Sequence, residues 1–468
     1  MTRVVIIGGG PGGYEAALVG SQLGGEVTLV DTDGLGGSAV LTDCVPSKTL
    51  IATAEVMAQV HESAQLGLRF GTGDSGADGA SGVHVDLAAV NRRVLDLARQ
   101  QSADICDRVQ REKVELVIGR GRLDGPDRVV AQTADGERTF DAEVILVATG
   151  ARPRELPEAE PDGERILTWT QVYGLRDLPE KLIVVGSGVT GAEFASAYHA
   201  LGAEVMLVSS RDRVLPGEDA DAAQVLEHVF GRQGLSVLGR SRAQSVTRDG
   251  DGVTVTLTDG RTVSGSHCLL AVGSLPNTSD MGLEEAGVTL DPGGFIEVDR
   301  VSRTTARGVY AAGDCTGVLM LASVAAMQGR IAMWHSLGDA VAPLDLKTVS
   351  SNVFTAPEIA TVGVTQAQVD SGEVQGRAIT LPLKTNARAK MQGLTDGFVK
   401  IFCRTVTGIV VGGVVVAPRA SELIYPLAVA VAQRLTVDQV SGSFTVYPSL
   451  TGSLAEAARR LHSSGSIS

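Results

Sequence analysis

Two glycine-rich turns are the parts of this chain best suited to hold a charged ligand. Each has the spacing Gly-x-Gly-x-x-Gly and lies between a short apolar run and a helix-like stretch. The glycines are Gly8, Gly10, Gly13, Gly186, Gly188 and Gly191. Without side chains the backbone can approach a pyrophosphate, which then lies at a helix N-terminus where free amides and the helix dipole favour an anion. One such motif is weak evidence, but two in the same context predict two dinucleotide sites.

The ribose ends of these two sites differ. After the first fingerprint the next strand ends at Asp31, whose carboxylate can accept hydrogen bonds from a ribose diol. The equivalent place after the second fingerprint is Ser209, followed by Ser210 and Arg211. Hydroxyls and a guanidinium group would bind a 2′-phosphate that a carboxylate would repel, so NADPH is predicted to serve at least as well as NADH. The alternatives are an ordinary turn aspartate and a solvated basic turn.

Cys44 is the thiol with the most suggestive surroundings, in the run Cys-Val-Pro-Ser-Lys that ends at Lys48. Three interpretations stay open: an inert small residue, a thiolate with a pKa lowered by a helix N-terminus, and a residue that cycles through a sulfenic acid. We prefer the first, because Asp43 would oppose a thiolate. The cysteines have no CxxC spacing, so the sequence predicts no metal site, no disulfide framework and a reducing cytoplasmic setting.

The elements that must position these residues form two βαβ units followed by a different region. Helices are also expected after the first unit, separated by a glycine-rich loop, and Asp-Gly turns predict a β-meander in the second unit. The predicted strands are residues 2–7, 27–30, 144–147, 182–185, 205–208 and 309–310; the helices are 48–62 and 86–112; the loop is 71–82. From about residue 349 the pattern has no fingerprint, which indicates a third domain.

Length and composition narrow the class of protein. A chain of 468 residues is too long for one core. Its 57 glycines and 44% apolar content suit an α/β protein, and its net charge of −14 makes nucleic acid an improbable partner. Neither a signal peptide nor an apolar run of about 18 residues is evident, so no membrane span is predicted.

The chain resembles the flavoprotein disulfide reductases, the family of lipoamide dehydrogenase and glutathione reductase. The resemblance rests on the Cys-x-Pro-Ser-Lys segment, Ala-Thr-Gly at 148–150, Ala-Ala-Gly-Asp at 311–314 and the two fingerprints, in the family's order. It implies an α/β fold with two Rossmann-like dinucleotide-binding domains and a C-terminal α+β dimerisation domain, and hence a homodimer. The implied domains are 1–150 and 276–348 for FAD, 151–275 for NAD(P)H and 349–468 for dimerisation.

The resemblance also assigns roles to residues. Asp314 would bind the ribityl chain of FAD, and Lys48 and Glu193 would form a pair near the reactive flavin nitrogen. A cation there would stabilise negative charge on the reduced flavin, although the pair could instead only fix one helix against the next domain. Further cofactor contacts are implied at Gly121, Thr149, Gly273, Met320 and Ala322.

Two departures from the family concern its redox chemistry. The family frame is Gly-Gly-Thr-Cys-x-x-x-x-Cys-x-Pro-Ser-Lys, but Ala39 stands where the first cysteine belongs. The family's C-terminal His-Pro-Thr-x-x-Glu supplies a base and its orienting acid, and here Tyr447 and Gly452 replace them. The tyrosine hydroxyl has a pKa of ~10, which is too high for it to act as a base toward a thiol at neutral pH. Dithiol chemistry is therefore predicted to be lost.

These observations predict an FAD-dependent oxidoreductase that passes electrons from NAD(P)H through flavin directly to a quinone-type acceptor. Two other enzymes stay open: a soluble NAD(P) transhydrogenase, and an oxidase or peroxidase that depends on Cys44. A non-catalytic nucleotide-binding scaffold is the alternative from another class.

Overall fold

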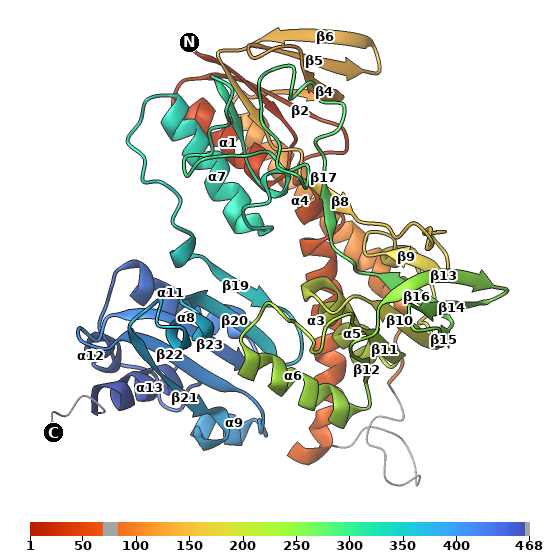
Figure 1. The fold of residues 1–468 in the computed structure, drawn as a ribbon, viewed down its shortest axis with the longest axis vertical. Coiled ribbons are helices and arrows are strands. Elements are labelled where there is room, and N and C mark those ends of the chain that lie inside the picture. Colours follow the sequence, from red (N-terminus) through yellow and green to blue (C-terminus); the bar gives the residue numbers. More distant parts are fainter. Residues whose placement is uncertain (69–82, 464–468) are drawn as a thin grey trace.

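A computed structural model describes residues 1–68 and 83–463, and Figure 1 shows its fold as a ribbon. The first nucleotide-type unit lies at the top of this view, the second at the lower right, and the C-terminal region, drawn in blue, at the lower left. The predicted loop at 71–82 lies outside the described residues. The mixed α/β class, with two parallel-sheet units and a C-terminal region of a different kind, is as the sequence predicted.

The first unit is a five-stranded parallel sheet in the order β18-β7-β1-β2-β3. The central strands β1 and β7 are near-continuous apolar runs that are buried on both faces, as expected where helices cover a parallel sheet. Helices α1 and α7 pack against each other beside it. The strands are β1 Arg3–Ile7, β2 Glu26–Asp31, β3 Glu115–Ile118, β7 Val144–Val147 and β18 Val309–Ala311; the helices are α1 Pro11–Gln22 and α7 Ala322–Ser336.

The second unit repeats this arrangement. Its parallel sheet has the order β12-β11-β10-β16-β9, so β10 and β11 take the places of β1 and β2, and β16 and β9 those of β7 and β18. The two βαβ units predicted from the sequence therefore share one topology. The strands are β9 Ile166–Thr168, β10 Lys181–Val185, β11 Glu204–Val208, β12 Ser236–Leu238 and β16 His267–Leu270; the helices are α5 Val189–Leu201 and α6 Ala220–Gln233.

Each unit also carries a three-stranded antiparallel meander. The sequence predicted only the second, although the Asp135-Gly136 turn in the first is the same kind of signal. A two-stranded ribbon of β8 and β17 joins the units. The strands are β4 Arg120–Leu123, β5 Arg128–Thr133, β6 Gly136–Asp141, β8 Ala151–Pro153, β13 Ala243–Asp249, β14 Gly252–Leu257, β15 Thr262–Gly265 and β17 Ser274–Pro276.

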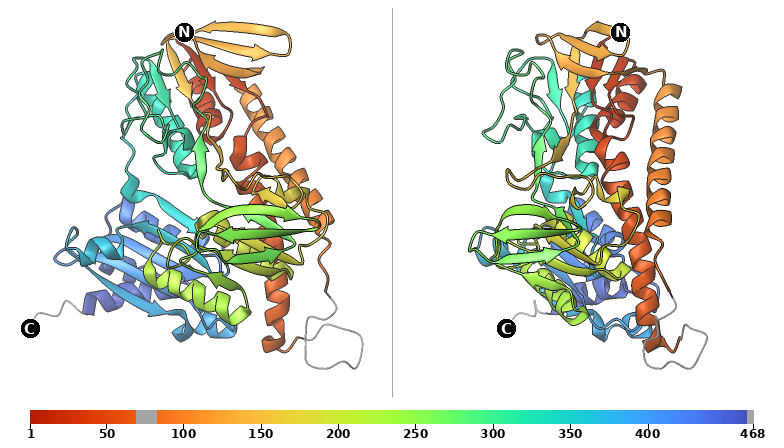
Figure 2. Two further views of the ribbon diagram at one scale, coloured as in Figure 1. Left: turned by 45° about the vertical axis from the view of Figure 1, so that its right-hand side comes forward. Right: turned by 90° about the vertical axis from the view of Figure 1, so that its right-hand side faces the viewer.

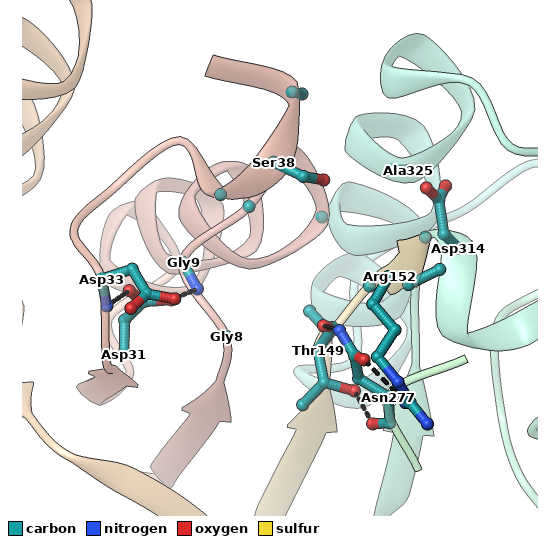
Figure 3. A pocket seen from close by; sticks show the side chains of 18 of the residues that line it. Gly8, Gly9, Asp31, Asp33, Ser38, Thr149, Arg152, Asn277, Asp314 and Ala325 are labelled. Atoms are coloured by element: carbon teal, nitrogen blue, oxygen red, sulfur yellow. Dashed lines mark hydrogen bonds between the residues drawn. The ribbon is translucent and has the colours of Figure 1, made fainter. Parts of the chain in front are cut away.

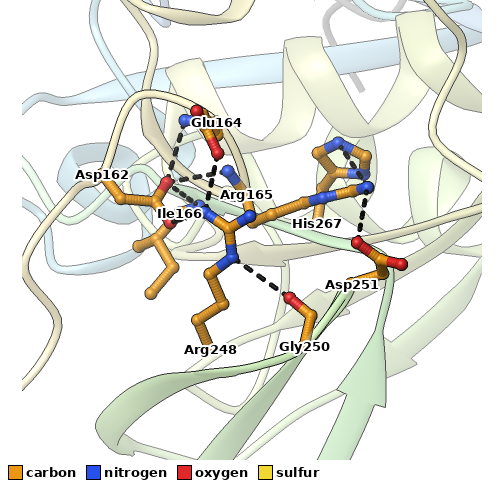
Figure 4. Close-up of polar contacts among 8 residues, drawn as sticks. All are labelled: Asp162, Glu164, Arg165, Ile166, Arg248, Gly250, Asp251 and His267. Atoms are coloured by element: carbon orange, nitrogen blue, oxygen red, sulfur yellow. Dashed lines mark hydrogen bonds and ion pairs between the residues drawn. The ribbon is translucent and has the colours of Figure 1, made fainter.

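An ion-pair network fixes the second meander to its parallel sheet (Figure 4). Arg248, from β13, reaches Asp162 at 3.1 Å and Glu164 at 2.8 Å in the segment before β9. One Asp162 oxygen also accepts three backbone N–H bonds, including one from Arg165. The Arg165 guanidinium lies 3.2 Å from Nε2 of buried His267. Burial and this cation lower the pKa of His267 to about 4, so the imidazole is neutral.

The C-terminal region is an antiparallel sheet in the order β19-β20-β23-β22-β21, with helices packed against it. Buried Lys400 in β22 binds Asp219 at 2.9 Å and Asp221 at 2.6 Å, which ties this region to the start of α6. The strands are β19 Ser350–Val353, β20 Glu358–Gly363, β21 Gly376–Pro382, β22 Phe398–Arg404 and β23 Val410–Ala417; the helices are α8 Gln366–Asp370, α9 Ala387–Met391, α10 Ala420–Leu423, α11 Tyr425–Ala432, α12 Val437–Ser441 and α13 Gly452–Ser463.

Two long helices run along the molecule, as the side views in Figure 2 show. Helix α3 (Cys44–Glu62) starts four residues earlier than the sequence predicted, directly after the short helix α2 (Gly37–Leu41). Helix α4 (Leu87–Arg111) agrees with the prediction, and the Asp86 side chain caps it by accepting from the Ala89 amide at 2.9 Å. Within residues 1–68 and 83–463, no helix has both the length and the apolarity to cross a bilayer.

Candidate cofactor and redox site

The glycines of the first turn let its backbone pack closely against the backbone of neighbouring segments. Gly8 has φ +105°, and a Cβ there would collide with the Ala148 carbonyl at the end of β7. A Cβ on Gly13 would collide with the Gly8 carbonyl, so this glycine lets α1 pack on the strand. Gly10 is not crowded in this way, since an added Cβ would make only an ordinary contact, 3.9 Å from the Cα of Gly37. It precedes α1, whose first amides have no side-chain cap and remain available to an anion.

A cavity of about 730 Å³ opens above this turn. Asp31 and Asp314 lie on opposite sides of it (Figure 3). Asp31 accepts from the Gly9 amide at 2.6 Å, and its other oxygen accepts from Asp33 and Gly34. The sequence-predicted residues that line the cavity are Gly8, Gly10, Asp31, Cys44, Gly121, Thr149, Asp314, Met320 and Ala322.

The floor of the cavity is fixed by polar contacts that the sequence did not reveal. The Thr149 hydroxyl donates to the Asn277 carbonyl at 2.7 Å, and the Asn277 amide donates back to the Thr149 carbonyl at 3.0 Å. The Arg152 guanidinium donates to the Asn277 side chain at 3.2 Å (Figure 3). These bonds connect the end of β7 to the residue after β17. No motif marks Asn277, because only the β8–β17 ribbon brings it there.

Acidic groups gather at the inner side of the cavity. Burial and the nearby Asp43 carboxylate raise the pKa of Asp314 to about 6. Burial raises the pKa of Asp43 itself, and the Lys48 ammonium opposes this shift. Burial and Asp43 also raise the pKa of the Cys44 thiol to about 12. The thiol is therefore neutral at physiological pH, which argues against the thiolate interpretation of Cys44.

Lys48 and Glu193 form the predicted pair, at 2.7 Å. The Glu193 side chain is only 4% exposed, and its second oxygen accepts from the Phe354 amide at 2.9 Å. The Lys48 ammonium also lies 5.0 Å from the centre of the Phe354 ring. Burial alone would lower the pKa of Lys48, but the Glu193 carboxylate raises it, so the ammonium stays charged. The pair joins α3, α5 and the entry to the C-terminal region. The sequence did not predict the contacts of Phe354 with this pair.

The second glycine turn repeats the backbone arrangement of the first. Added Cβ atoms on Gly186 and Gly191 would collide with the carbonyls of Ala271 and Gly186, while Gly188 faces open space. Gly273 follows β16 with φ +99°.

The side chains beyond the second turn differ from those beyond the first. Ser209 is fully buried, and its hydroxyl lies 2.6 Å from that of Ser187 inside the fingerprint. Ser210 and Arg211 are exposed. Side-chain contacts to a bound nucleotide from this segment can therefore come from Ser210 and Arg211, whereas Ser209 shapes the turn. Ser187, in a variable position of the motif, gave no signal in the sequence.

Tyr447 lies away from all of these groups. Its side chain is 85% exposed, and it is not among the residues that line the cavity. Phe444 and Val446 beside it are also exposed. Within a single chain, Tyr447 therefore does not line the cavity that Cys44 borders. Among residues 1–68 and 83–463, no cluster of three or more His, Cys, Asp or Glu could hold a metal ion.

Two dinucleotide-type units, one with a deep cavity and one with an open turn, define a two-nucleotide flavoprotein oxidoreductase. The chain belongs to the pyridine nucleotide-disulphide oxidoreductase family, whose family model matches residues 2–329. The family's dimerisation domain matches residues 349–458. Membership implies FAD and NAD(P)H. The structure fits both, since each turn offers a glycine cradle at a free helix N-terminus and the cavity is large enough for a dinucleotide.

Similar proteins cover nearly the whole chain. It is 56% identical to a Mycobacterium tuberculosis protein named NAD(P)H dehydrogenase (quinone), over 98% of this chain and 94% of that protein. It is 33% identical to the dihydrolipoyl dehydrogenase of Zymomonas mobilis, over 97% of this chain and 96% of the relative. The crystal structure of LpdA from Mycobacterium tuberculosis superposes with a TM-score of 0.93 at 55% identity, covering 98% of this chain and 100% of that one.

Proposed function

We propose that this chain is an FAD-dependent NAD(P)H:quinone oxidoreductase and does not reduce disulfides. The observation that carries the proposal is the loss of two separate parts of the dithiol machinery, with Ala39 at the first cysteine position and Tyr447 at the base position. The neutral Cys44 thiol supports it. The relative that is 56% identical and named NAD(P)H dehydrogenase (quinone) supports the choice of acceptor.

Each group of residues has a separate proposed role in cofactor binding or electron transfer. The first turn and Asp31 would hold the FAD pyrophosphate and adenosine ribose, and Asp314 would accept a hydrogen bond from the ribityl chain. FAD supplies the two-electron chemistry between nicotinamide and acceptor. Lys48, kept charged by Glu193, would supply a cation to stabilise the negative charge that grows on the flavin during reduction. The roles of Gly121, Thr149, Met320 and Ala322 rest on their place along the cavity.

NAD(P)H would bind at the second turn, with the pyrophosphate at the start of α5. Exposed Ser210 and Arg211 favour NADPH, and the absence of a carboxylate at Ser209 removes repulsion of a 2′-phosphate. NADH lacks only that phosphate and can use the same turn. The dimerisation domain supports a homodimer, and exposed Phe444 and Tyr447 fit a surface that a second copy covers. The domain boundaries at 150, 275 and 348 and the cytoplasmic setting stay predictions.

The test is steady-state oxidation of NADPH and of NADH with a panel of acceptors: naphthoquinones, benzoquinones, lipoamide, oxidised glutathione, an NAD analogue and hydrogen peroxide. We expect turnover with quinones and none above background with either disulfide. Disulfide turnover comparable to quinone turnover would refute the proposal. Faster turnover with the NAD analogue or with peroxide would assign a transhydrogenase or a peroxidase instead.

A Cys44 variant distinguishes direct electron transfer to a quinone from the peroxidase alternative. Cys44→Ser should keep quinone turnover within a few-fold of wild type, since direct transfer needs no thiol. Loss of about 100-fold with FAD still bound, equivalent to roughly 2.7 kcal/mol of transition-state stabilisation, would give Cys44 the redox role and contradict the proposal.

A further inference from the structure

Quinone reduction needs a source of protons. Conversion of a quinone to a hydroquinone takes two electrons and two protons, while NAD(P)H delivers two electrons and one proton as hydride. One further proton must come from the enzyme or from water. The family's proton-exchanging histidine and its carboxylate are absent, and exposed Tyr447 stands in the histidine's place. This inference rests on the proposed function, and it concerns the group that replaces that base.

The acids that line the cavity can be compared one by one. Both oxygens of Asp31 already accept backbone N–H bonds. Asp33 and Asp280 are exposed at the surface. Asp314 has the predicted role of holding the ribityl chain. Asp43 is the remaining carboxyl among the cavity-lining residues.

Two hydrogen bonds hold the backbone of Asp43, whereas its side chain makes no hydrogen bond to the helix. Its amide donates to the Ser38 carbonyl at 2.7 Å, and its carbonyl accepts from the Ser47 amide at 2.7 Å. It occupies the N-cap position of α3, where an aspartate side chain ordinarily accepts from the helix, yet it makes no such bond. Asp43 lines the cavity next to Cys44, at the segment that carries the disulfide in dithiol members of the family, and its carboxyl is not engaged by the helix.

The surroundings of Asp43 shift its equilibrium toward the neutral acid form. Burial raises its pKa, and of the neighbouring charges only Lys48 opposes this shift. The Lys48 ammonium is already paired with Glu193 at 2.7 Å, which weakens its pull on a second carboxylate. The buried Tyr173 hydroxyl has no hydrogen-bond partner among the described residues, and Asp43 is the charge that acts most strongly on it. The groups that face Asp43 are Cys44 and Lys48 of α3, Glu193 of α5, Tyr173 and Asp314.

We propose that Asp43 is the proton donor to the quinone. In this step the O–H bond of the Asp43 carboxylic acid breaks and an O–H bond forms on a quinone oxygen, as the electron pair from NAD(P)H arrives by way of FAD. The other quinone oxygen takes the proton that entered with the hydride. Asp43 is left as a carboxylate and regains its proton from water, so the sum is NAD(P)H, one proton and quinone giving NAD(P)+ and hydroquinone.

The decisive experiment compares an acceptor that needs protons with one that does not. Asp43→Asn holoenzyme is assayed with a naphthoquinone and with ferricyanide, which takes electrons alone. We expect quinone turnover to fall about 100-fold, in line with loss of a general acid, and ferricyanide turnover to stay within two-fold of wild type. Asp43→Glu should recover part of the quinone rate. The matched control is Asp177→Asn, which removes the same charge from an exposed position outside the cavity.

The pH dependence provides a second measurement. Wild-type quinone turnover should fall as the pH rises through the raised pKa of Asp43, while the residual turnover of Asp43→Asn should lack that step. Infrared spectroscopy of the oxidised holoenzyme over a pH series should show a protonated carboxyl band that persists to higher pH than that of an exposed aspartate and is missing in Asp43→Asn, a readout independent of turnover.

Three outcomes would overturn the inference: equal quinone turnover in Asp43→Asn and wild type, a parallel loss with both acceptors, or no protonated carboxyl band that depends on Asp43. A wild-type enzyme that reduces ferricyanide but no quinone would instead refute the proposed function itself. The two failures are therefore distinguishable.

Discussion

The two nucleotide-type units share one backbone plan and differ in what surrounds it. In both, the first glycine of the fingerprint lies against the carbonyl end of a neighbouring strand, and the third lets the helix pack on the turn. The first unit adds a cavity of about 730 Å³, whereas the second presents an open turn with exposed Ser210 and Arg211. We therefore expect the first copy to hold a resident cofactor and the second an exchanging one.

The difference extends to the residue at the end of the second strand. Asp31 accepts from the amide of Gly9 inside the first fingerprint. In the second copy the hydroxyls of Ser187 and Ser209 form the corresponding link, at 2.6 Å. A hydrogen bond between two neutral hydroxyls thus replaces a hydrogen bond to a charged carboxylate, and the glycine turn is kept. The charge near the ribose can therefore change while the backbone arrangement stays the same.

The largest expected effect comes from the third glycine of each turn. In Gly13→Ala and Gly191→Ala the new methyl group would overlap a carbonyl oxygen, at a cost of roughly 3 kcal/mol locally. Gly13→Ala should purify without flavin, while Gly191→Ala should keep FAD and lose NAD(P)H binding. Flavin absorbance and nucleotide titration check this, with Gly231→Ala as a control because its Cβ meets nothing within 4 Å. Equal loss of flavin in both variants would contradict the division of roles.

The next effect concerns the pair that joins the units. Lys48→Met leaves the Glu193 carboxylate buried without its cation, and should lower the free energy of unfolding by about 3 kcal/mol and nearly abolish NAD(P)H oxidation. Lys48→Met with Glu193→Gln together should regain stability but not turnover, since the charge near the flavin is still missing. Denaturant unfolding and single-turnover flavin reduction separate the two effects. Full turnover in the double variant would reduce the pair to a structural role.

A smaller and selective effect is expected at the open turn. Arg211→Ala should raise the KM for NADPH about ten-fold, equivalent to ~1.4 kcal/mol, because a charge-assisted contact to the 2′-phosphate is lost. The KM for NADH should change less than two-fold. Steady-state kinetics with both nucleotides measure this. Equal changes would show that Arg211 does not contact the 2′-phosphate.

The smallest effect is on stability in acid, and it belongs to the second unit. The pKa of His267 is lowered to about 4 in the folded chain, against ~6.5 when unfolded, so the unfolded state gains a proton first as the pH falls. His267 should therefore cost about 1 kcal/mol of stability between pH ~7 and ~5.5. Thermal unfolding of His267→Gln should lack this part of the pH dependence. Exposed His84→Gln is the control, and an unchanged pH profile in His267→Gln would refute the assignment.

Much of the fold could be predicted from the sequence because the signals are local. Strand-turn-helix segments around Gly8 and Gly186 set the two units, since glycine spacing and apolar runs report on neighbouring residues alone. The start of α3 at Cys44 was misjudged, because Pro46 within its first turn is compatible with a helix N-terminus and was not used as a start signal. The loss of dithiol chemistry was also visible, since it depends only on which residues are absent.

The sequence by itself determined the family, the two nucleotide units and the missing redox pair, because each follows from residue types at short spacing. Only the tertiary structure decided which groups meet. Asn277 reaches Thr149, Phe354 reaches Glu193, and Asp43 lines the cavity with Asp314. These contacts join segments far apart in the chain, and the raised pKa values of Cys44 and Asp43 follow from burial that no local pattern encodes.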